Sequence, residues 1–283
     1  DCMLQKTFHV ALMVCVLSGC TSHSSPSENV TTPVDTLAMI LEDDSYFEDS
    51  EAIEREKAMP VAVDETFSDF IFNFAGNEHF QRSRISFPLH FNELGDDKVV
   101  EKRNWMFLDL FCGRDYYTVL YGNHNDTEME KHRDIETVRF ENIYLMDSLV
   151  RTLVFNRQEG KWKMTKETLS RIEQHPLCAF LSFYRTFTND TILREAYLSE
   201  TIRYNTTDPE DGFSRIDGTI SADQWSAFAP ELPGDELTNI DYGQKFSDSQ
   251  RIVLLKCGIS NGFMDELHFR CGQHGWKLTA YEN

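Results

Sequence analysis

Two segments of the chain carry the apolar spacing of an amphipathic helix, and the second repeats the first. The apolar residues of the first segment are Phe67, Phe70, Ile71 and Phe74. Those of the second segment are Phe180, Phe183, Tyr184 and Phe187, each 113 positions later. Spacings of three, one and three residues place four side chains on one face of a helix. A polar turn follows each segment, and we expect a second short helix around Phe80 and around Leu193.

Alternating apolar and polar residues predict a pair of antiparallel strands toward the end of each copy. In the first copy, "ETVRFENIYLM" turns at Asp147–Ser148 into "LVRTLVFNRQ". In the second copy, "QRIVLLKCGIS" turns at Asn261–Gly262 into "FMDELHFRCG". The two turns differ by 114 positions, as do Trp162 and Trp276 in the closing strands. Offsets that agree across unrelated residue types indicate that one unit is written twice.

The middle segments of the two copies resemble each other less than their ends do. Trp105 and Trp225 differ by 120 positions, which places extra residues in the surface-type sequence "NTTDPEDGFSRIDG". Each copy thus consists of a helix, a short helix, a break, another short helix around the Trp, and a run of antiparallel strands. A curved antiparallel sheet wrapped on N-terminal helices buries the many Phe side chains. We therefore predict an α+β fold with tandem duplicated cone-like domains at residues 61–168 and 169–283.

This order of elements resembles the nuclear transport factor two-like superfamily, and the chain also resembles the Bacteroidetes lipoproteins grouped as domain of unknown function 4348. The resemblance rests on "DETFSDFIFNFAGNEHFQRSRISFPL", on the strand-closing "GKWKMTKE" and on the second-copy "FLSFYRTFTND", and it covers residues 61–283. It implies the cone fold and an exported protein. It implies no activity, because that family has no established chemistry.

Four cysteines remain once those of the N-terminal segment are set aside, namely Cys112, Cys178, Cys257 and Cys271. In an oxidising compartment they allow three full pairings, and no CxxC spacing points to a zinc site. In a hairpin with a two-residue turn at Asn261–Gly262, the residue numbers of two directly opposed positions add up to 523. Cys257 then faces Glu266, whereas Cys271 faces Ile252 on the opposite side of the sheet. We expect these two cysteines not to be bonded to each other.

The N-terminal residues have the pattern of a lipoprotein signal. The apolar run from Val10 to Leu17 is too short to span a bilayer as a mature helix. It leads into Leu17–Cys20, which resembles a bacterial lipobox, where the cysteine is acylated and becomes the new N-terminus. Several acyl chains together give a durable anchor. We expect a signal peptide at 1–19 and membrane attachment through Cys20.

Residues 20–60 lack apolar periodicity and are rich in Ser, Thr, Pro and acids, which is typical of a disordered tether. The stretch "LEDDSYFEDSEAIERE" holds eight acids against one Arg, and it is either a solvated linker or a cation-binding patch. Bacteroidetes lipoproteins bound for the cell exterior usually carry acids directly after the lipidated cysteine. Here the first acid is Glu28, so we expect an outer-membrane anchor that faces the periplasm.

The charge and the motifs exclude several classes of protein. A formal net charge of −20 repels phosphate backbones, so nucleic acid is not expected as a partner. The chain has no GxSxG, phosphate loop or dinucleotide glycine pattern, and we expect no cofactor. Asp35–Leu37 resembles the short O-glycosylation motif of exported Bacteroidetes proteins, which makes Thr36 a candidate.

The histidines do not predict a metal site. His124 and His132 lie in an acidic loop that could take up a divalent ion, but two His eight residues apart in a loop are more often solvated. The remaining histidines of the two copies that stand singly beside strand or loop residues are His90, His175, His268 and His274. We interpret them as surface or satisfied histidines and expect no metal.

Acid–base chemistry in a cone cavity needs a carboxylate, Tyr or His whose pKa is tuned by burial. The candidates of the first copy, close to Trp105, are Asp109, Tyr116 and Tyr117. Those of the second copy, after Trp225, are Asp241 and Tyr242. The plainer interpretation places both Trp side chains in the core and Asp109 on the exposed side of a helix.

Three hypotheses of function follow, of which the third makes the groove between the two domains a docking site for an envelope protein. The first is an exported, lipid-anchored cell-envelope protein that binds a small molecule, a glycan or another envelope protein without catalysis. The alternative is an acid–base enzyme of isomerase, dehydratase or hydrolase type that uses one cone cavity. An enclosed cavity with Asp109 or Asp241 beside a Tyr favours the enzyme, and an interior packed by Phe, Trp and Leu favours the binding protein.

Overall fold

The computed structural model describes residues 61–244, 246 and 250–283. These residues form two six-stranded curved sheets and several short helices, which confirms the predicted α+β class with two cone-like units. The signal peptide expected at 1–19, the tether at 20–60, Cys20 and Thr36 lie outside the described residues. No helix in the described part of the chain is long and apolar enough to cross a membrane.

The first copy begins with helices and continues into strands. Its α-helices and 3₁₀ turns are η2 (Val61–Asp64), α2 (Phe67–Gly76), α3 (Glu78–Ser83), η3 (Lys102–Asn104) and η4 (His124–Lys131). Its strands are β1 (Ile85–Glu93), β2 (Asp96–Val100), β3 (Tyr116–Tyr121), β4 (Thr137–Tyr144), β5 (Leu149–Gln158) and β6 (Lys161–Arg171). Thr66 caps α2, because its side chain accepts a hydrogen bond from the Asp69 amide.

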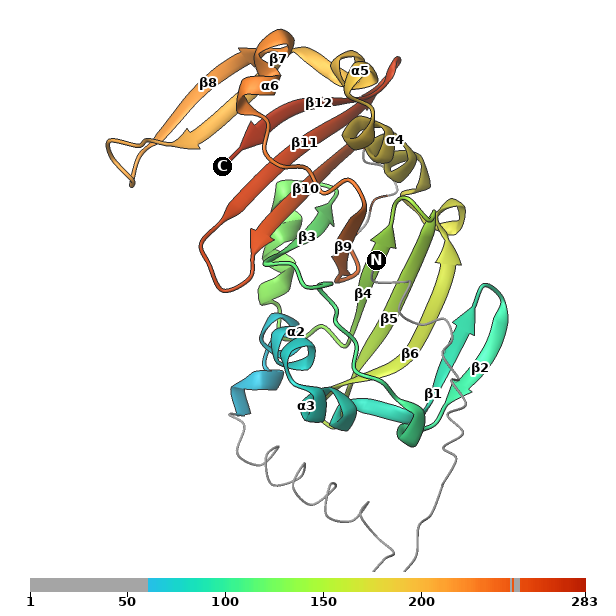
Figure 1. The fold of residues 1–283 in the computed structure, drawn as a ribbon. Helices are drawn as coiled ribbons and strands as arrows, with labels where there is room; N and C mark the ends of the chain where they lie inside the picture. The colour runs from blue at the N-terminus through green and yellow to red at the C-terminus, as the bar shows by residue number, and fades with distance from the viewer. Residues whose placement is uncertain (1–60, 245, 247–249) are drawn as a thin grey trace, which may run out of the picture. The chain divides into compact units, whose positions relative to one another are not determined.

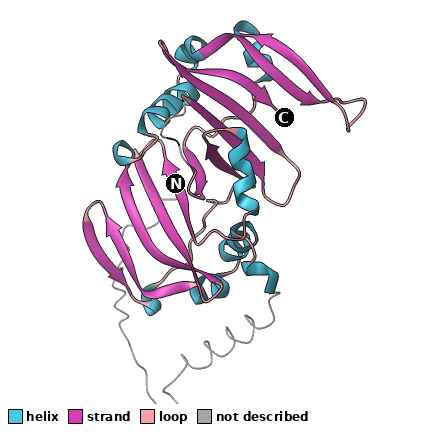
Figure 2. Cartoon of the chain, turned by 180° about the vertical axis from the view of Figure 1, so that it is seen from behind, coloured by secondary structure: helices cyan, strands magenta, loops and turns pink. Residues whose placement is uncertain are grey.

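The second copy repeats this order. Its helices and 3₁₀ turns are η5 (Ile172–Gln174), α4 (Cys178–Asn189), α5 (Thr191–Arg194), η6 (Glu195–Tyr197), η7 (Ala222–Gln224) and α6 (Trp225–Phe228). Its strands are β7 (Leu198–Thr207), β8 (Arg215–Ser221), β9 (Glu236–Asp241), β10 (Arg251–Gly258), β11 (Met264–Gly272) and β12 (Gly275–Glu282). Seen from behind, strands predominate over helices in the fold (Figure 2).

Each sheet takes one edge strand from the other copy. The first sheet has the order β2-β1-β6-β5-β4-β9, and the second sheet has the order β3-β10-β11-β12-β7-β8. Strand β3 therefore pairs with β10, and β9 pairs with β4, both antiparallel. Figure 1 shows green β3 beside red β10, and β9 beside β4. The expected boundary between residues 168 and 169 falls within β6, and the sheets share strands across it.

The two exchanged strands meet at their free edges through equivalent threonines. Thr118 of β3 and Thr238 of β9 are joined by four hydrogen bonds of 2.6 to 2.9 Å. Each amide donates to the other residue's Oγ1, and each hydroxyl donates to the other residue's carbonyl oxygen. Both residues are buried, so these side chains satisfy backbone groups that no neighbouring strand reaches.

The hydrophobic residues form two clusters, and each extends into the other copy. The first cluster surrounds α2 and includes Val253 and Leu255 of β10. The second cluster surrounds α4 and includes Ile143 of β4 and Leu145 just after it. Strands β3 and β9 are buried on both faces over most of their length, because they lie between the two clusters. The two copies are therefore held together by shared core as well as by shared sheets.

Equivalent rings pack in the same way in the two copies. The Phe67 and Trp162 rings lie 5.2 Å apart, edge to face, and the equivalent Phe180 and Trp276 rings also lie 5.2 Å apart. Phe155 of β5 and its equivalent Phe269 of β11 each contact the helix of their own copy by ring edges. The duplication predicted from sequence offsets thus extends to side-chain packing, and both tryptophans are packing anchors on a sheet.

Several predicted details need correction. The break after the second short helix is a strand hairpin, β1 and β2 in the first copy and β7 and β8 in the second. The sheets are not wholly antiparallel, because β1 pairs parallel with β6 and β7 pairs parallel with β12. Asp109 is exposed, but it lies in an irregular segment and not on a helix. Trp105 follows η3, whereas Trp225 begins α6.

The predicted register of the second hairpin is wrong by two residues. Opposed positions of β10 and β11 sum to 521, so Cys257 faces Met264 and not Glu266. The connection is a four-residue loop closed by a hydrogen bond from the Gly258 amide to the Phe263 carbonyl. Asn261 does not form a two-residue turn, because its side chain folds back to accept the Phe263 amide at 3.0 Å. Gly258 makes room for it, since a Cβ there would lie 1.6 Å from Asn261 Oδ1.

The expectation that Cys257 and Cys271 are not bonded is confirmed. Both are free thiols. The corrected register shifts the pairing by an even number of residues, so the two cysteines still point to opposite faces of the sheet. Burial raises the pKa of the Cys257 thiol from 9.0 to about 11, and the hydrogen bond to Tyr117 opposes this shift.

We predict that Cys257 alkylates slowly in the folded protein. A rise of two pKa units lowers the thiolate fraction at pH 8 roughly a hundredfold, and the thiolate is the species that reacts. Iodoacetamide labelling followed by peptide mass spectrometry should show Cys257 modified roughly a hundredfold more slowly in the native chain than in urea. Equal rates for Cys257 in the two conditions would contradict this expectation.

We also predict that the threonine pair stabilises the fold. Thr118→Val leaves the buried amide and carbonyl of Thr238 unpaired, which costs about 1–3 kcal/mol for each group. Thr238→Val should destabilise similarly, and the double variant should lose less than the sum, because both changes remove the same contact. Urea unfolding measures these free energies. Thr201→Val on exposed β7 is the control, and equal stability of Thr118→Val and Thr201→Val would refute the prediction.

Candidate functional site

The space between helix and sheet is filled in both copies. In the first copy it holds the rings of Phe67, Phe70, Phe74 and Phe155, all at most 2% exposed. In the second copy it holds Phe180, Tyr184, Phe187 and Phe269, all at most 1% exposed. Such packing makes each interior a hydrophobic core. Hollows with polar linings lie instead on the outer faces of the sheets, the faces turned away from α2 in the first sheet and from α4 in the second.

A shared β-bulge determines which residues reach these outer faces. The β5–β6 register shifts between Val154 and Phe155, and the β11–β12 register shifts between His268 and Phe269, 114 positions later. The extra residue is Thr165 in β6 and Thr279 in β12. A bulge of one residue reverses the face of every later side chain. The ends of β6 and β12 therefore present polar residues outward.

The larger hollow, which we call the outer groove, has a volume of about 800 Å³. Its floor is the outer face of the first sheet, and its walls are the residues after η5 and after β9. The lining side chains used below are Arg139, Glu141, Thr152, Val154, Lys166, Thr168, Ser170, His175, Asn239, Asp241 and Phe246. They offer hydroxyls, an amide and charges of both signs, with one aromatic ring at the wall.

A hydrogen-bonded network forms one end of the outer groove. Glu141, at most 8% exposed, accepts from Asn239 Nδ2 at 2.8 Å and lies 3.3 Å from His175 Nε2. His175 Nδ1 accepts the Leu177 amide at 3.1 Å, which leaves Nε2 as the donor to Glu141. Asn239 in turn accepts the Leu120 amide of β3. Every polar atom of the imidazole is thus committed, and the network serves to hold β3, β4, β9 and the start of α4 together.

Of the predicted acid–base residues, Asp241 lines the groove and Tyr242 does not. Asp241 ends β9 and pairs with Arg139 of β4 at 2.8 Å. Tyr242 is 5% exposed and lies in the core of the first copy, with its ring 6.2 Å from Phe67. Burial raises its pKa well above the ordinary value. These second-copy residues belong to the first cone, because β9 is exchanged.

The predicted residues of the first copy do not meet in a cavity. Asp109 is exposed, and its carboxylate accepts the Phe111 amide at 3.2 Å. Tyr116 is half-buried at the start of β3, where the Lys256 ammonium lies 4.6 Å from its ring. Burial raises the Tyr116 pKa, against the opposing effect of Arg114. Tyr117 contacts Phe72 and Phe111, and burial raises its pKa too.

The second hollow, of about 420 Å³, lies on the outer face of the second sheet. Three arginines line it, Arg203 of β7, Arg251 of β10 and Arg270 of β11, together with His268. Arg251 and Arg270 are direct cross-strand partners, an arrangement of like charges that is unfavourable by itself. In a protein with a net charge of −20, this hollow is a local gathering of positive charge.

The residues that matter most at these faces were not singled out from the sequence as a group. Glu141, His175 and Asn239 come from three separate stretches, and His175 and His268 stand alone along the chain. Their proximity depends on the strand exchange and on the register, which no local pattern reveals. The His132 side chain, from the predicted acidic loop, is exposed and lies 3.7 Å from Asp134.

Comparisons with known proteins agree with the architecture. A family model described as Domain of unknown function (DUF4348) matches residues 47–283. The crystal structure of an NTF2-like protein from Bacteroides fragilis is similar, with a TM-score of 0.73 and 34% sequence identity. That match covers 79% of this chain and 98% of the other. No curated protein matches the chain. With a family model that covers most of its length and an NTF2-like relative at 34% identity, the chain belongs to the DUF4348 family.

Proposed function

We propose that this protein is an exported, lipid-anchored component of the cell envelope that binds a polar ligand without catalysis, and that the outer groove is the binding site. A glycan suits the groove best, because a ligand rich in hydroxyl groups can use the mixed donors and acceptors of its floor. Thr152, Thr168 and Ser170 offer hydroxyls that donate and accept, and Lys166 and Arg139 offer donors.

The proposal rests on one observation, namely that hollows lined by polar side chains occur on the outer faces of the sheets and not inside the cones. Both cone interiors are packed by aromatic rings, and the polar hollows lie outside them on the sheet faces. A groove of about 800 Å³ lies within the range of ligand sites in proteins. The fold holds its floor firmly, because four of its lining strands belong to one sheet.

The same geometry gives no support to an acid–base enzyme. Asp109 is exposed, Tyr242 is buried in the core, and the Asp241 carboxylate is paired with Arg139. The His175 imidazole has both nitrogens engaged, so neither is available to accept a substrate proton. Binding is therefore the simpler function for these residues.

The location rests on the N-terminal sequence. Val10 to Leu17 is a short apolar run, and Leu17–Cys20 resembles a lipobox. The match to the DUF4348 family model includes the acidic stretch from residue 47 onward. A membrane anchor at Cys20 with an acidic tether would present the folded part to ligands in the periplasm, with the outer membrane as the anchoring membrane.

We predict that Cys20→Ala abolishes lipid attachment. Without the thiol no acyl chain is attached, so the variant should move from the membrane fraction to the soluble fraction of fractionated cells. Labelling with a radioactive fatty acid should mark the wild type and not the variant. Cys15→Ala is the matched control and should behave like the wild type. Membrane association of the Cys20→Ala variant would refute the anchor and leave the groove proposal standing.

We further predict that the outer groove binds oligosaccharides. A printed array of bacterial and host oligosaccharides, probed with the purified chain, should show signal on a subset of its members. Lys166→Ala and Arg139→Ala should each weaken that binding by roughly tenfold, as expected for losing one charged hydrogen bond. Arg103→Ala, on an exposed residue of η3, is the control. Absence of wild-type signal, or unchanged binding in both groove variants, would refute this function.

A further inference from the structure

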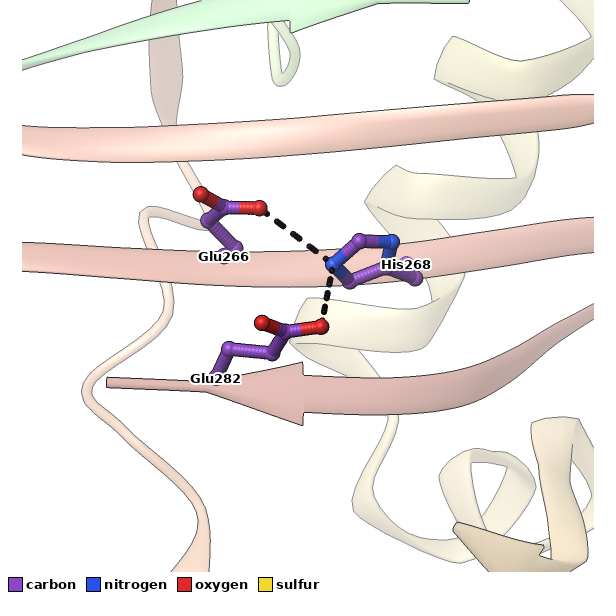
Figure 3. Close-up of side chains that lie close together, drawn as sticks. All are labelled: Glu266, His268 and Glu282. Carbon is purple, nitrogen blue, oxygen red and sulfur yellow. Dashed lines mark ion pairs between the residues drawn. The ribbon is translucent and has the colours of Figure 1, made fainter. Parts of the chain in front are cut away.

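The second sheet gathers three metal-ligating side chains on its outer face, beside the second hollow. They are Glu266 and His268 of β11 and Glu282 of β12, and Figure 3 shows the two carboxylates converging on the imidazole. Their ligand atoms all lie within 4.8 Å of one another. In residues 61–244, 246 and 250–283 this is the one group of three His, Cys, Asp or Glu side chains that meets this spacing.

The strand geometry brings these side chains to one face. Glu266 and His268 are two residues apart on β11, so they point the same way. Glu282 is the direct cross-strand partner of Glu266. It reaches the outer face because the bulge at Thr279 reverses the later residues of β12, while Leu278 before the bulge remains in the core.

The distances are those of ion pairs between the imidazole and the two carboxylates, and they also suit ligands around a bound cation. His268 Nε2 lies 3.4 Å from Glu266 Oε2 and 3.3 Å from Glu282 Oε1. The Nε2 atom is itself buried, yet it makes no hydrogen bond of acceptable geometry to either carboxylate. Two ligands bound tetrahedrally to zinc, at about 2.0–2.1 Å each, are about 3.3–3.4 Å apart. The two separations from His268 Nε2 match that value.

The two opposed carboxylates are also the charges that a cation would neutralise. Glu266 and Glu282 are directly opposed acids on adjacent strands, a pairing that is unfavourable without a positive charge between them. The Glu266 side chain is only 8% exposed, so water screens it poorly. Arg203 donates to Glu282 Oε1 at 2.8 Å from the exposed side. That contact can orient the carboxylate as an outer partner orients a metal ligand.

We propose that Glu266, His268 and Glu282 bind a divalent transition-metal cation, with Zn²⁺ as the ion that fits best. A nitrogen ligand with two carboxylates suits zinc, whereas Mg²⁺ and Ca²⁺ prefer sites built from oxygen alone. Three protein ligands leave a fourth position for water or a ligand group. This site is independent of the proposed glycan binding, which uses the other sheet.

The first copy supplies an internal comparison. The residues equivalent to Glu266, His268 and Glu282, each 114 positions earlier, are Thr152, Val154 and Thr168. They occupy the same sheet positions beside the same bulge and line the outer groove. They offer no nitrogen and no carboxylate, so the proposal assigns one metal site to the chain.

The test is calorimetric titration of ZnCl₂ into the full chain, purified in detergent and stripped with a chelator. We expect one tight site, and any binding by the acidic tether should be common to all variants. His268→Ala, Glu266→Gln and Glu282→Gln should each weaken that site by more than about tenfold. His132→Ala removes an exposed histidine from another acidic surface and should leave the tight site unchanged.

Cobalt gives an independent readout of the geometry. Co²⁺ in place of Zn²⁺ should give the intense visible absorption of a tetrahedral complex, and His268→Ala should abolish it. Thermal unfolding should shift upward with Zn²⁺ in the wild type and in His132→Ala only. The proposal would be overturned if the wild type had no tight site, or if both His268→Ala and Glu282→Gln retained it. A Co²⁺ spectrum unchanged by His268→Ala would overturn it too.

Discussion

The meeting of two sheet edges in the middle of the protein is the constraint on which the rest of the structure depends. Strands β3 and β9 are edge strands, and an edge exposes amides and carbonyls that must find partners. Both strands are buried, so water cannot act as the hydrogen-bond partner of these amides and carbonyls, and side chains do so instead. Thr118 and Thr238 satisfy each other, while Gln244 donates to the carbonyls of Leu120 and Ile240. The exchange of strands is stable because these polar residues stand where the edges meet, and it joins the two copies into a single folded unit.

The bulge shared by β6 and β12 links this framework to the surfaces where ligands could bind. Before the bulge the side chains of both strands enter the core, as Met164 and Leu278 do. After it, Lys166 and Thr168 face the outer groove, and Glu282 reaches the outer face of the second sheet, where it lies 3.3 Å from His268. One inserted residue therefore allows each strand to place side chains in the core at one end and polar side chains on the outer face at the other. The bulge lies at equivalent positions in the two copies, so both strands divide these roles in the same way.

Local features could be predicted from the sequence, and those that depend on long-range pairing could not. The helix faces around Phe67 and Phe180, the strand pairs and the offset of 114 follow from short-range periodicity, and they were correct. The sequence gives no signal of the strand exchange. The apolar run of β3 indicates burial on two faces, but it does not indicate which sheet contains the partner strand. The hairpin register failed because the Asn261 side chain replaced a backbone turn. Asp241 and Tyr242 were noticed, but their environment belongs to the other copy. Glu266, His268 and Glu282 looked unrelated, since only the register and the bulge bring them together.

The two copies differ where they have freedom to differ. Ring packing keeps the interiors alike, as the equal separations of Phe67 from Trp162 and of Phe180 from Trp276 show. Interior positions are also tied to the other copy through the exchanged strands, so a change in one core disturbs both. The parts of the outer faces that lie beside the bulges carry no such restriction. On one backbone arrangement they hold threonines and valine in the first copy and two carboxylates with a histidine in the second. Duplication with strand exchange thus gives two copies of the same scaffold. Their outer faces are two separate surfaces on which different binding chemistry could develop.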